Sequence, residues 1–460
     1  MSGIMEYTNI LLPNYDHCIL GITSSILKYY NASSGYKSNS ALDIALSKKR
    51  YKNIIFFVLD GMGEYILENI SKDGFFKQNE VDCVTSVYPS TTTAALTSYY
   101  SGKSPYETGW IAWSQYFKEY GRAIDMFSHK ESYLGDSIKN PLKDVFATDM
   151  HYKSIFKQIE EASPNVKAFE VEPEYAERRA DRSISANNLD ELISTINDIV
   201  TMPGENFVLA YCDYPDGLLH KYGTDSVETK NFVIEAEQKI KNLREKLDDD
   251  TLIIVSADHG HKNIEKTYTL LDYPEILECL ITPPSFEPRV ISFWVKEDMK
   301  NAFVERFNKK FETEFWLLTK EEFLDKYHFL GTGKKHPKID DFVGNYVALS
   351  VGGSMIRIET FLAEGKPIKK STHCGLSKEE MAVPVIVLWK FWGRSKKFFA
   401  PSPKFLAQSR GFEPPKVLPL LVFETSAFNR SAKTAFMFPL DSFLTGTYRF
   451  YFFFFNLSSV

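Results

Sequence analysis

Three segments of the chain are apolar without the alternation of polar and apolar positions that marks a half-exposed strand. They are "NIIFFVLDG" (53–61), "NFVLAYCDY" (206–214) and "TLIIVSADHG" (251–260). A continuous apolar run of this length is typical of a parallel strand that is covered on both faces of its sheet. We therefore expect these segments to be neighbouring strands of one buried sheet.

The segments between these runs have apolar residues at helical spacing, most clearly over 149–161, 187–200 and 226–247. That spacing places the apolar side chains on one face of a helix, which then packs against a sheet. Strands that alternate with helices predict an α/β fold with a doubly wound, mostly parallel sheet sandwiched by helices.

The pattern changes over residues 281–345, where "RVISFWV" predicts a strand and "KNAFVERFNKKFE" an amphipathic helix. We expect these residues to form a small α+β cap inserted into the main domain. Two more expected strands, "YVALSVGG" and "AVPVIVLWK", follow the cap. One main domain over residues 1–393, with the cap inside it, accounts for this order.

Residues 394–460 differ from the rest of the chain. Fourteen of the 36 phenylalanines fall in 395–460, where eight basic residues face three acidic ones. Neither strand nor helix periodicity is sustained there, and an aromatic run such as "RFYFFFFNL" is costly to expose to water. The segment is either an additional C-terminal subdomain or foreign to the native fold, and the sequence leaves both readings open.

The overall composition excludes some classes of protein. The net charge is −6, and the chain has no long basic block, which argues against a groove for nucleic acid. Its five cysteines are scattered and never form a CxxC pair, as expected for reduced thiols. No apolar stretch is long enough to span a membrane, and the first residues lack the pattern of a signal peptide. These features favour a cytoplasmic protein.

Acidic residues follow all three expected strands. Asp60 ends the first, Asp213 and Asp216 follow the second, and Asp258 follows the third. In doubly wound sheets, ligands bind outside the carboxyl ends of the strands. A single acid at such a place would be an ordinary turn residue, but three indicate a functional site.

Histidines accompany two of these acids. Asp216 and His220 are four residues apart and would share one face of a helical turn, where they could chelate a divalent metal ion. Taken alone, such a pair is more often a surface pair. Asp258, His259 and His261 lie within four residues of one another in "SADHGHK", beside a glycine that permits a sharp turn.

Two further segments could complete the site. His373, in "STHCG", would be an ordinary loop histidine if it did not join Asp216 and His220. The hydroxyl run 90–93 in "YPSTTTAAL" precedes an alanine-rich helical stretch. Such hydroxyls are usually N-caps, but a helix N-terminus also favours an anion, and a metal ion could activate a hydroxyl there. These clusters fit two divalent ions at a phosphoryl site.

The order of these motifs resembles the alkaline phosphatase superfamily, and especially its nucleotide pyrophosphatase/phosphodiesterase branch. The motifs "VLDGMG", "PSTT", "PDGLLHKYG", "SADHGH" and "THCG" follow one another over roughly residues 50–390 in the family's order. The resemblance implies an alkaline-phosphatase-like catalytic domain over 1–393. It also implies a hydrolase of phosphodiester or pyrophosphate bonds in small molecules, of which nucleotides are an example.

The resemblance also implies roles for individual residues. One metal ion would be held by Asp60, Asp258 and His259, and the other by Asp216, His220 and His373. In this branch the nucleophilic threonine precedes a helix-ending glycine by ten residues. Counting back from Gly102 selects Thr92, which would also contact metal, with Thr91 as the alternative; His261 would lie behind the ligands. The ions are expected to be Zn²⁺, with Mn²⁺ as the alternative.

The sequence departs from the family pattern at Trp113. Phosphodiesterases of this branch have an asparagine at the corresponding position, where it helps to hold a phosphoryl oxygen. Either Ser114 or Gln115 replaces that donor, or the metal ions take over its part. The indoles of Trp110 and Trp113 could stack on a nucleobase, although packing in the core is the more common role of such residues.

Other activities of the same superfamily differ in the motifs that they require. A sulfatase would need a Cys or Ser followed by Pro and Arg, and a cofactor-independent phosphoglycerate mutase a Ser nucleophile and a large inserted domain. Neither pattern is evident. A phosphonate-ester or phosphonoacetate hydrolase is a closer alternative, because it uses a threonine with the same set of metal ligands. A metal-binding homologue without turnover is the alternative outside the enzymes. The sequence does not indicate an oligomeric state.

Overall fold

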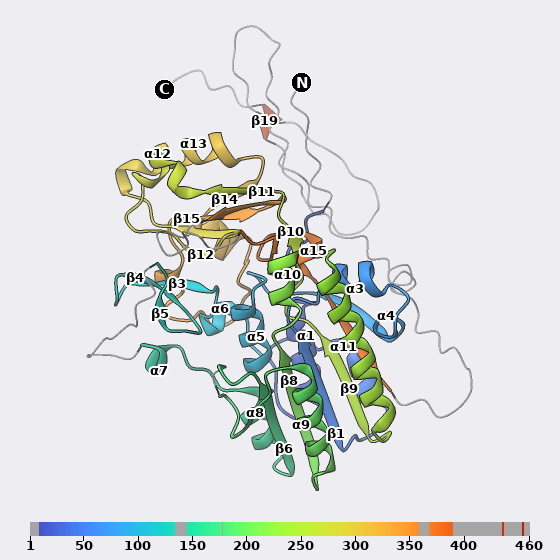
Figure 1. Cartoon of the computed structure of the whole chain (residues 1–460). Helices are drawn as coiled ribbons and strands as arrows, with labels where there is room; N and C mark the ends of the chain where they lie inside the picture. Colours follow the sequence, from blue (N-terminus) through green and yellow to red (C-terminus); the bar gives the residue numbers. More distant parts are fainter. Residues whose placement is uncertain are drawn as a thin grey trace. The chain divides into compact units, whose positions relative to one another are not determined.

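One of the two seven-stranded sheets in the described part of the chain has the order β2-β18-β9-β1-β8-β6-β7 (Figure 1). The computed structural model describes residues 9–133, 145–176, 178–357, 368–389, 435–436 and 453–454. Neighbouring strands are parallel except where β18 pairs with β2 and β9. The strands are β1 (Asn53–Leu59), β2 (Glu80–Thr85), β6 (Val166–Glu172), β7 (Arg182–Ser185), β8 (Glu205–Cys212), β9 (Thr251–Ser256) and β18 (Ala382–Leu388). The expected mostly parallel α/β sheet is confirmed.

Strand β1 lies at the centre of this sheet, between β8 and β9. All seven of its residues are buried, which explains why the segment is apolar without alternation. Each of the three strands expected from the sequence is present and ends shortly before the acids that follow it. Asp60 and Asp258 therefore lie just beyond the carboxyl ends of β1 and β9.

Helices cover both faces of the sheet. Tyr30, at the end of α1, and Phe156 of α8 pack against Phe207 of β8, while Tyr99 of α5 packs against Phe56 of β1. Helices α9 and α11 lie in front of the sheet in Figure 1. The helices of this part are α1 (Ile19–Tyr29), α2 (Ser40–Leu46), α3 (Glu64–Ser71), α4 (Phe75–Gln78), α5 (Thr92–Ser101), α6 (Pro105–Thr108), α7 (Val145–Asp149), α8 (Ile155–Ala162), α9 (Leu189–Thr201), α10 (Asp216–Tyr222), α11 (Val227–Lys246) and α15 (Lys378–Met381).

N-cap side chains set the starts of the three helices expected from the sequence. Asn188 accepts a hydrogen bond from Glu191 N at the start of α9, and the Ser226 hydroxyl accepts one from Thr229 N at the start of α11. Both helices follow the expected ranges closely. The helix expected over 149–161 begins only at α8, because Ser154 caps that helix.

A second, antiparallel sheet has the order β14-β15-β13-β12-β3-β4-β5. Phe293 of this sheet packs against Phe303 and Phe307 of α13, which form part of a separate apolar core. The strands are β3 (Ser114–Phe117), β4 (Arg122–Asp125), β5 (Lys130–Glu131), β12 (Ser285–Glu287), β13 (Val290–Phe293), β14 (Phe315–Thr319) and β15 (Tyr346–Ser350). The helices and helical turns of this part are η1 (Leu270–Asp272), α12 (Pro274–Leu277), η2 (Glu297–Met299), α13 (Lys300–Phe311), η3 (Glu322–Lys326) and α14 (Ile339–Phe342).

This second sheet extends beyond the insertion expected over 281–345. It also includes β3 to β5 from residues 114–131, and β15, whose sequence gave no sign of which sheet it would join. The reason is that antiparallel pairing joins short strands from distant parts of the chain, and the link between β3 and β12 is the single pair Phe286 with Ser114.

Two short ladders lie outside the two seven-stranded sheets. Strand β10 (Lys262–Asn263) pairs with β17 (Ser371–Thr372), and β11 (Lys266–Thr269) pairs with β16 (Ser354–Arg357). Strands β19 (Ala435–Phe436) and β20 (Phe453–Phe454) pair with each other. Apart from these four residues, the readings of segment 394–460 concern residues that lie outside the described structure. Among the described helices, none has the length and apolar character needed to cross a bilayer.

Candidate active site

Asp60, Asp258 and His259 meet at the carboxyl ends of β1 and β9. His259 Nε2 lies 3.5 Å from Asp60 Oδ1 and 3.3 Å from Asp258 Oδ2. All three side chains are buried, and these two carboxylate oxygens have no hydrogen-bond partner among the described residues. Buried carboxylate oxygens without a partner are costly unless a cation or a donor satisfies them. The three ligands expected for one metal ion are therefore together and converge on one point.

Two glycines after β1 allow this convergence. Gly61 adopts a φ of +75°, and its N–H donates to Asp258 Oδ1 over 3.0 Å. A Cβ atom at Gly63 would lie only 2.4 Å from the Cα atom of Gly260, so the two backbones touch where no side chain fits. These glycines bring the turn after β1 against the turn that carries His259.

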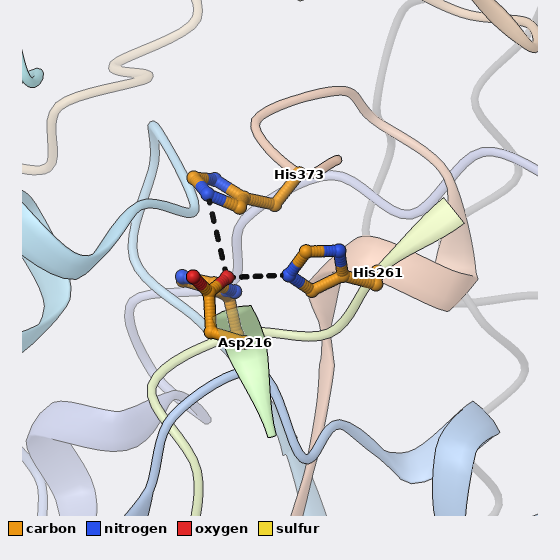
Figure 2. A group of neighbouring side chains, drawn as sticks. Asp216, His261 and His373 are labelled. Carbon is orange, nitrogen blue, oxygen red and sulfur yellow. Dashed lines mark hydrogen bonds and ion pairs between the residues drawn. The ribbon is translucent and has the colours of Figure 1, made fainter. Parts of the chain in front are cut away.

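A second group gathers around Asp216, the first residue of α10. Its Oδ1 atom lies 2.6 Å from His261 Nε2 and 3.9 Å from His373 Nε2 (Figure 2). His220 Nε2 lies 3.4 Å from the same oxygen, as expected for residues one helical turn apart. The stacked rings of His259 and His373, with centroids 4.0 Å apart, link the two groups.

The structure thus brings together all of the residues expected as metal ligands, and it also places His261 close to them. The candidate ligand atoms of Asp216, His259, His261 and His373 lie within 4.8 Å of one another, so His261 lies close to the expected ligands. Asp213 joins neither group, because its carboxylate accepts a hydrogen bond from Tyr175 Oη over 2.9 Å.

Ser371 of β17 orients two of the histidines. Its carbonyl oxygen lies 2.8 Å from His220 Nδ1, and its hydroxyl oxygen 3.1 Å from His261 Nδ1. A partner at Nδ1 fixes the ring and directs Nε2 at the ligand position, as is usual for histidines that bind metal. Lys369, two residues earlier, places its Nζ atom 3.2 Å from His220 Nε2 and adds a positive charge beside the group.

The electrostatics of the site favour a cation. Burial, and then the charges of Asp258 and Asp216, raises the pKa of Asp60 well above its usual range. Burial would also raise the pKa of Asp216, but the facing imidazoles hold it well below its usual range. Burial lowers the pKa of His220 to about 3, so that its imidazole is neutral and suited to bind a metal. Three carboxylates and four imidazoles at this spacing fit divalent ions of the zinc or manganese type.

The hydroxyl run separates into distinct environments. Thr92, the first residue of α5, has its Oγ1 atom 3.3 Å from both Asp60 Oδ2 and His259 Nε2. The hydroxyl of Thr91 instead donates to Glu287 Oε1 over 2.9 Å. Ser90 Oγ and Thr93 Oγ1 are buried and have no partner among the described residues. Thr92 is thus the hydroxyl that faces the first group of ligands.

The position of Trp113 has an unexpected neighbour. Its backbone N–H donates to Glu287 Oε1 over 2.8 Å, while the residue is 43% exposed. Gln115 does not reach the site, because its side chain accepts from Ile111 N and donates to Gly109 O. The Ser114 hydroxyl pairs with another hydroxyl, that of Ser132. Neither side chain therefore faces Thr92.

Sequence reasoning did not identify Glu287 or Tyr211 as part of the site. The Tyr211 hydroxyl donates to Asp60 Oδ2 and holds that carboxylate from β8. Its position five residues before Asp216 on an expected strand is a signal that could have found it. Glu287 comes from the second sheet, 196 residues beyond the threonine that it contacts, and no local pattern distinguishes it.

Comparisons with known proteins agree with this arrangement. Residues 54–349 match the model of the family "Type I phosphodiesterase / nucleotide pyrophosphatase". Among solved structures, the fold is similar to murine ectonucleotide pyrophosphatase/phosphodiesterase 5, an inactive variant in complex with AMP. The TM-score is 0.56 at 15% identity, over 73% of this chain and 87% of that one.

Two further solved structures share the fold. The human form of the same ectonucleotide pyrophosphatase/phosphodiesterase has a TM-score of 0.54 at 14% identity, over 73% of this chain and 87% of that one. Phosphonoacetate hydrolase from Sinorhizobium meliloti 1021, in complex with phosphonoformate, has a TM-score of 0.52 at 15% identity, over 77% and 93%. No curated protein sequence matches the chain.

Proposed function

The chain belongs to the type I phosphodiesterase/nucleotide pyrophosphatase family and is a hydrolase of phosphoric ester bonds, and we propose that it acts with two divalent metal ions and Thr92 as nucleophile. The observation that carries this proposal is the place of Thr92. Its hydroxyl lies at the N-terminus of α5, 3.3 Å from both Asp60 Oδ2 and His259 Nε2. A hydroxyl needs an activating partner to become a nucleophile, and these neighbours are the expected ligands of one ion.

Two groups of residues would hold the ions. Asp60, Asp258 and His259 would hold one, and Asp216, His220 and His373 the other, with His261 beside Asp216. A bound divalent ion lowers the pKa of a hydroxyl or water and stabilises charge on phosphoryl oxygens. Zn²⁺ suits the mixed nitrogen and oxygen donors, and Mn²⁺ is the alternative.

The chain's own residues account for the remaining steps. Thr92 Oγ1 forms a bond to phosphorus as the bond from phosphorus to the leaving oxygen breaks, which gives a phosphothreonine. The hydroxyl proton passes to solvent, and the leaving oxygen takes up a proton from solvent. Water then attacks phosphorus, frees the Thr92 hydroxyl and releases the phosphate product. Thr92 is the first residue of α5, and the free backbone N–H groups of a helix N-terminus favour a phosphoryl anion. Tyr211 keeps Asp60 oriented throughout.

We propose a small-molecule substrate with a phosphodiester or pyrophosphate bond, such as a nucleotide. The murine relative of this fold was solved with AMP, which supports a nucleotide. Lys369, beside His220, provides a cation for a further anionic group. A cytoplasmic location remains a prediction from the sequence.

A phosphonate-ester or phosphonoacetate hydrolase is the second candidate. The similarity to a phosphonoacetate hydrolase favours it, because that enzyme has the same fold at comparable coverage. Trp113 stands where the phosphodiesterases have an asparagine. The loss of that hydrogen-bond donor is compatible with a different class of substrate. A homologue that binds metal without turnover is the candidate from another class of protein.

One experiment separates the three candidates. Purified protein is analysed for bound metal and assayed with p-nitrophenyl phosphodiesters, dinucleotides and phosphonoacetate, before and after treatment with EDTA. We expect two ions per chain, turnover of a phosphodiester and loss of activity in EDTA. Turnover of phosphonoacetate alone would favour the second candidate, and metal-replete protein without any turnover would favour the binding homologue. Activity that survives EDTA would contradict the two-metal proposal.

A further inference from the structure

Arg289 and Glu380 form an ion pair that is completely buried between the two sheets. Arg289 Nε and one terminal nitrogen each donate to a different carboxylate oxygen of Glu380, both over 2.7 Å. Neither side chain has exposed surface. The other terminal nitrogen of Arg289 donates to Ser354 O over 2.7 Å. Arg289 lies between β12 and β13, so the second sheet supplies one partner of the pair and the segment before β18 supplies the other.

Glu380 is bound to both loops that carry metal-ligating histidines. Its carbonyl oxygen accepts from Gly260 N over 2.8 Å, one residue after His259. Its carboxylate accepts from Gly375 N over 2.7 Å, two residues after His373. Each loop carries one of the two histidines whose rings stack, so a shift of Glu380 would change the distance between them.

The loops that carry His259 and His373 are packed closely against Arg289 and the segment that carries Glu380. A Cβ atom at Gly375 would lie 2.4 Å from a terminal nitrogen of Arg289, and one at Gly260 would lie 2.0 Å from Glu379 O. Between His373 and Gly375, Cys374 has a φ of +81°, a left-handed conformation that side chains rarely adopt. Such a conformation is unfavourable and persists only where surrounding contacts impose it. The bond from Gly375 N to Glu380 is one of these contacts.

We propose that Arg289 and Glu380 are positioning residues that set the separation of His259 and His373, and with it the metal sites. This inference rests on the proposed function, since it concerns the binding of two metal ions. A buried ion pair is not needed for stability as such, because apolar residues of similar volume often replace one without loss. In this protein the ion pair would orient the Glu380 carboxylate so that it accepts the hydrogen bond from Gly375 N. An apolar side chain cannot accept that bond.

The test uses the full chain with Co²⁺, whose visible absorption reports the geometry of its ligands. The double variant Arg289→Met/Glu380→Leu removes both charges together but leaves Gly375 N without its acceptor, so its thermal unfolding temperature is measured alongside metal binding and is expected to fall. We expect its Co²⁺ affinity to fall about 10- to 100-fold, as on loss of partners behind metal ligands, with a changed absorption band. Arg289→Lys keeps the charge but not the paired bonds, so it should show a smaller loss in the same direction.

Arg244→Met is the matched control. Arg244 is also a buried arginine, but it binds the carbonyl oxygens of Leu247 and Thr251, at the amino end of β9, away from the site. It should lower the unfolding temperature without changing the Co²⁺ spectrum. If the double variant, or Arg289→Lys should the double variant not fold, binds two Co²⁺ ions with wild-type affinity and spectrum, the inference is wrong. Wild-type protein that binds no Co²⁺ would overturn the proposed function and this inference together.

Discussion

His261 Nε2 lies 2.6 Å from Asp216 Oδ1, closer than either His220 or His373 approaches that carboxylate. The ring of His261 is held on its other side by the Ser371 hydroxyl, 3.1 Å from Nδ1. This is the arrangement of an imidazole that helps to form a metal site. It connects His261 to the group around Asp216, although the residue follows the ligand pair Asp258 and His259 in sequence.

His261→Ala should therefore weaken one metal site more than the other. We expect the affinity of the site around Asp216 to fall about 10- to 100-fold, while the ion held by Asp60, Asp258 and His259 remains. Titration calorimetry with Zn²⁺ would resolve the two affinities. Equal weakening of both sites would mean that His261 acts on the whole site and not through Asp216.

Thr92→Ala should abolish turnover, because its hydroxyl is the one that faces Asp60 and His259. Loss of a nucleophile commonly reduces kcat by a factor on the order of 10⁴ or more. Thr91→Val is the matched control, since the Thr91 hydroxyl is bound to Glu287. It should retain most of the activity on a p-nitrophenyl phosphodiester. The opposite result for the two variants would assign the nucleophile to Thr91.

Asp60→Asn should remove the metal ion at the end of β1, and activity with it, while the fold is kept. The charged form of Asp60 is disfavoured by burial and by Asp258 and Asp216 when no cation is present. The neutral amide relieves this repulsion, so the unfolding temperature of the metal-free variant should equal or exceed that of the metal-free wild type. Metal analysis checks the loss of the ion, and circular dichroism checks that the fold is kept. A variant with full metal content and activity would make Asp60 an ordinary turn residue.

Glu172 should make stability depend on pH near neutrality. Burial raises its pKa to about 8, although the facing Arg179 opposes the shift. Between the ordinary value of 4.5 and about 8, the folded state binds a proton that the unfolded state has lost. The stabilisation is therefore complete below pH 4.5 and falls as the pH rises toward 8, by up to about 1.4 kcal/mol per pH unit.

Urea unfolding at a series of pH values would measure this slope. In Glu172→Gln the side chain does not titrate, so the slope between pH 5 and pH 8 should become smaller. An unchanged slope would show that Glu172 is ionised in the folded protein and that Arg179 outweighs burial.

Gly63→Ala should destabilise the protein and disturb the site, because the new methyl group would meet the backbone of Gly260 at 2.4 Å. Overpacking of this kind typically costs about 1–3 kcal/mol. Gly35→Ala is the matched control, since a Cβ atom there meets nothing within 4 Å. Thermal unfolding of the two variants should differ accordingly, and only Gly63→Ala should lose metal affinity. Equal unfolding temperatures would contradict the close approach of the two turns.

Site residues could be predicted from the sequence where they directly follow a buried strand. Asp60, Asp258 and His259 could be predicted because β1 and β9 are buried on both faces, which leaves a recognisable apolar run before each polar residue. Thr92 was distinguishable from Thr91 only by the family's spacing. The structure separates the two hydroxyls by their partners, which no local pattern contains.

The contribution of the second sheet could not be predicted. Glu287 and Arg289 reach the site through contacts with residues about 90 to 200 positions away in the chain, and neither lies in a periodic segment that indicates its partner. Strands such as β5, with two residues, are too short to show alternation. The apolar run of β15 is compatible with either sheet, so its pairing depends on tertiary contacts.

The ion pair of Arg289 and Glu380 has a consequence for the synthesis of the protein. Asp60 leaves the ribosome first among the ligands, whereas Arg289 and Glu380, which hold the loops of His259 and His373 in place, come 229 and 320 positions later. At roughly 5–20 residues per second, about 15 to 60 seconds separate the translation of Asp60 from that of Glu380. During that interval the β1 strand and its acid are made without the partners that close the site. We therefore expect the nascent chain to acquire its metal ions only near the end of translation, with most of the sheet already in place.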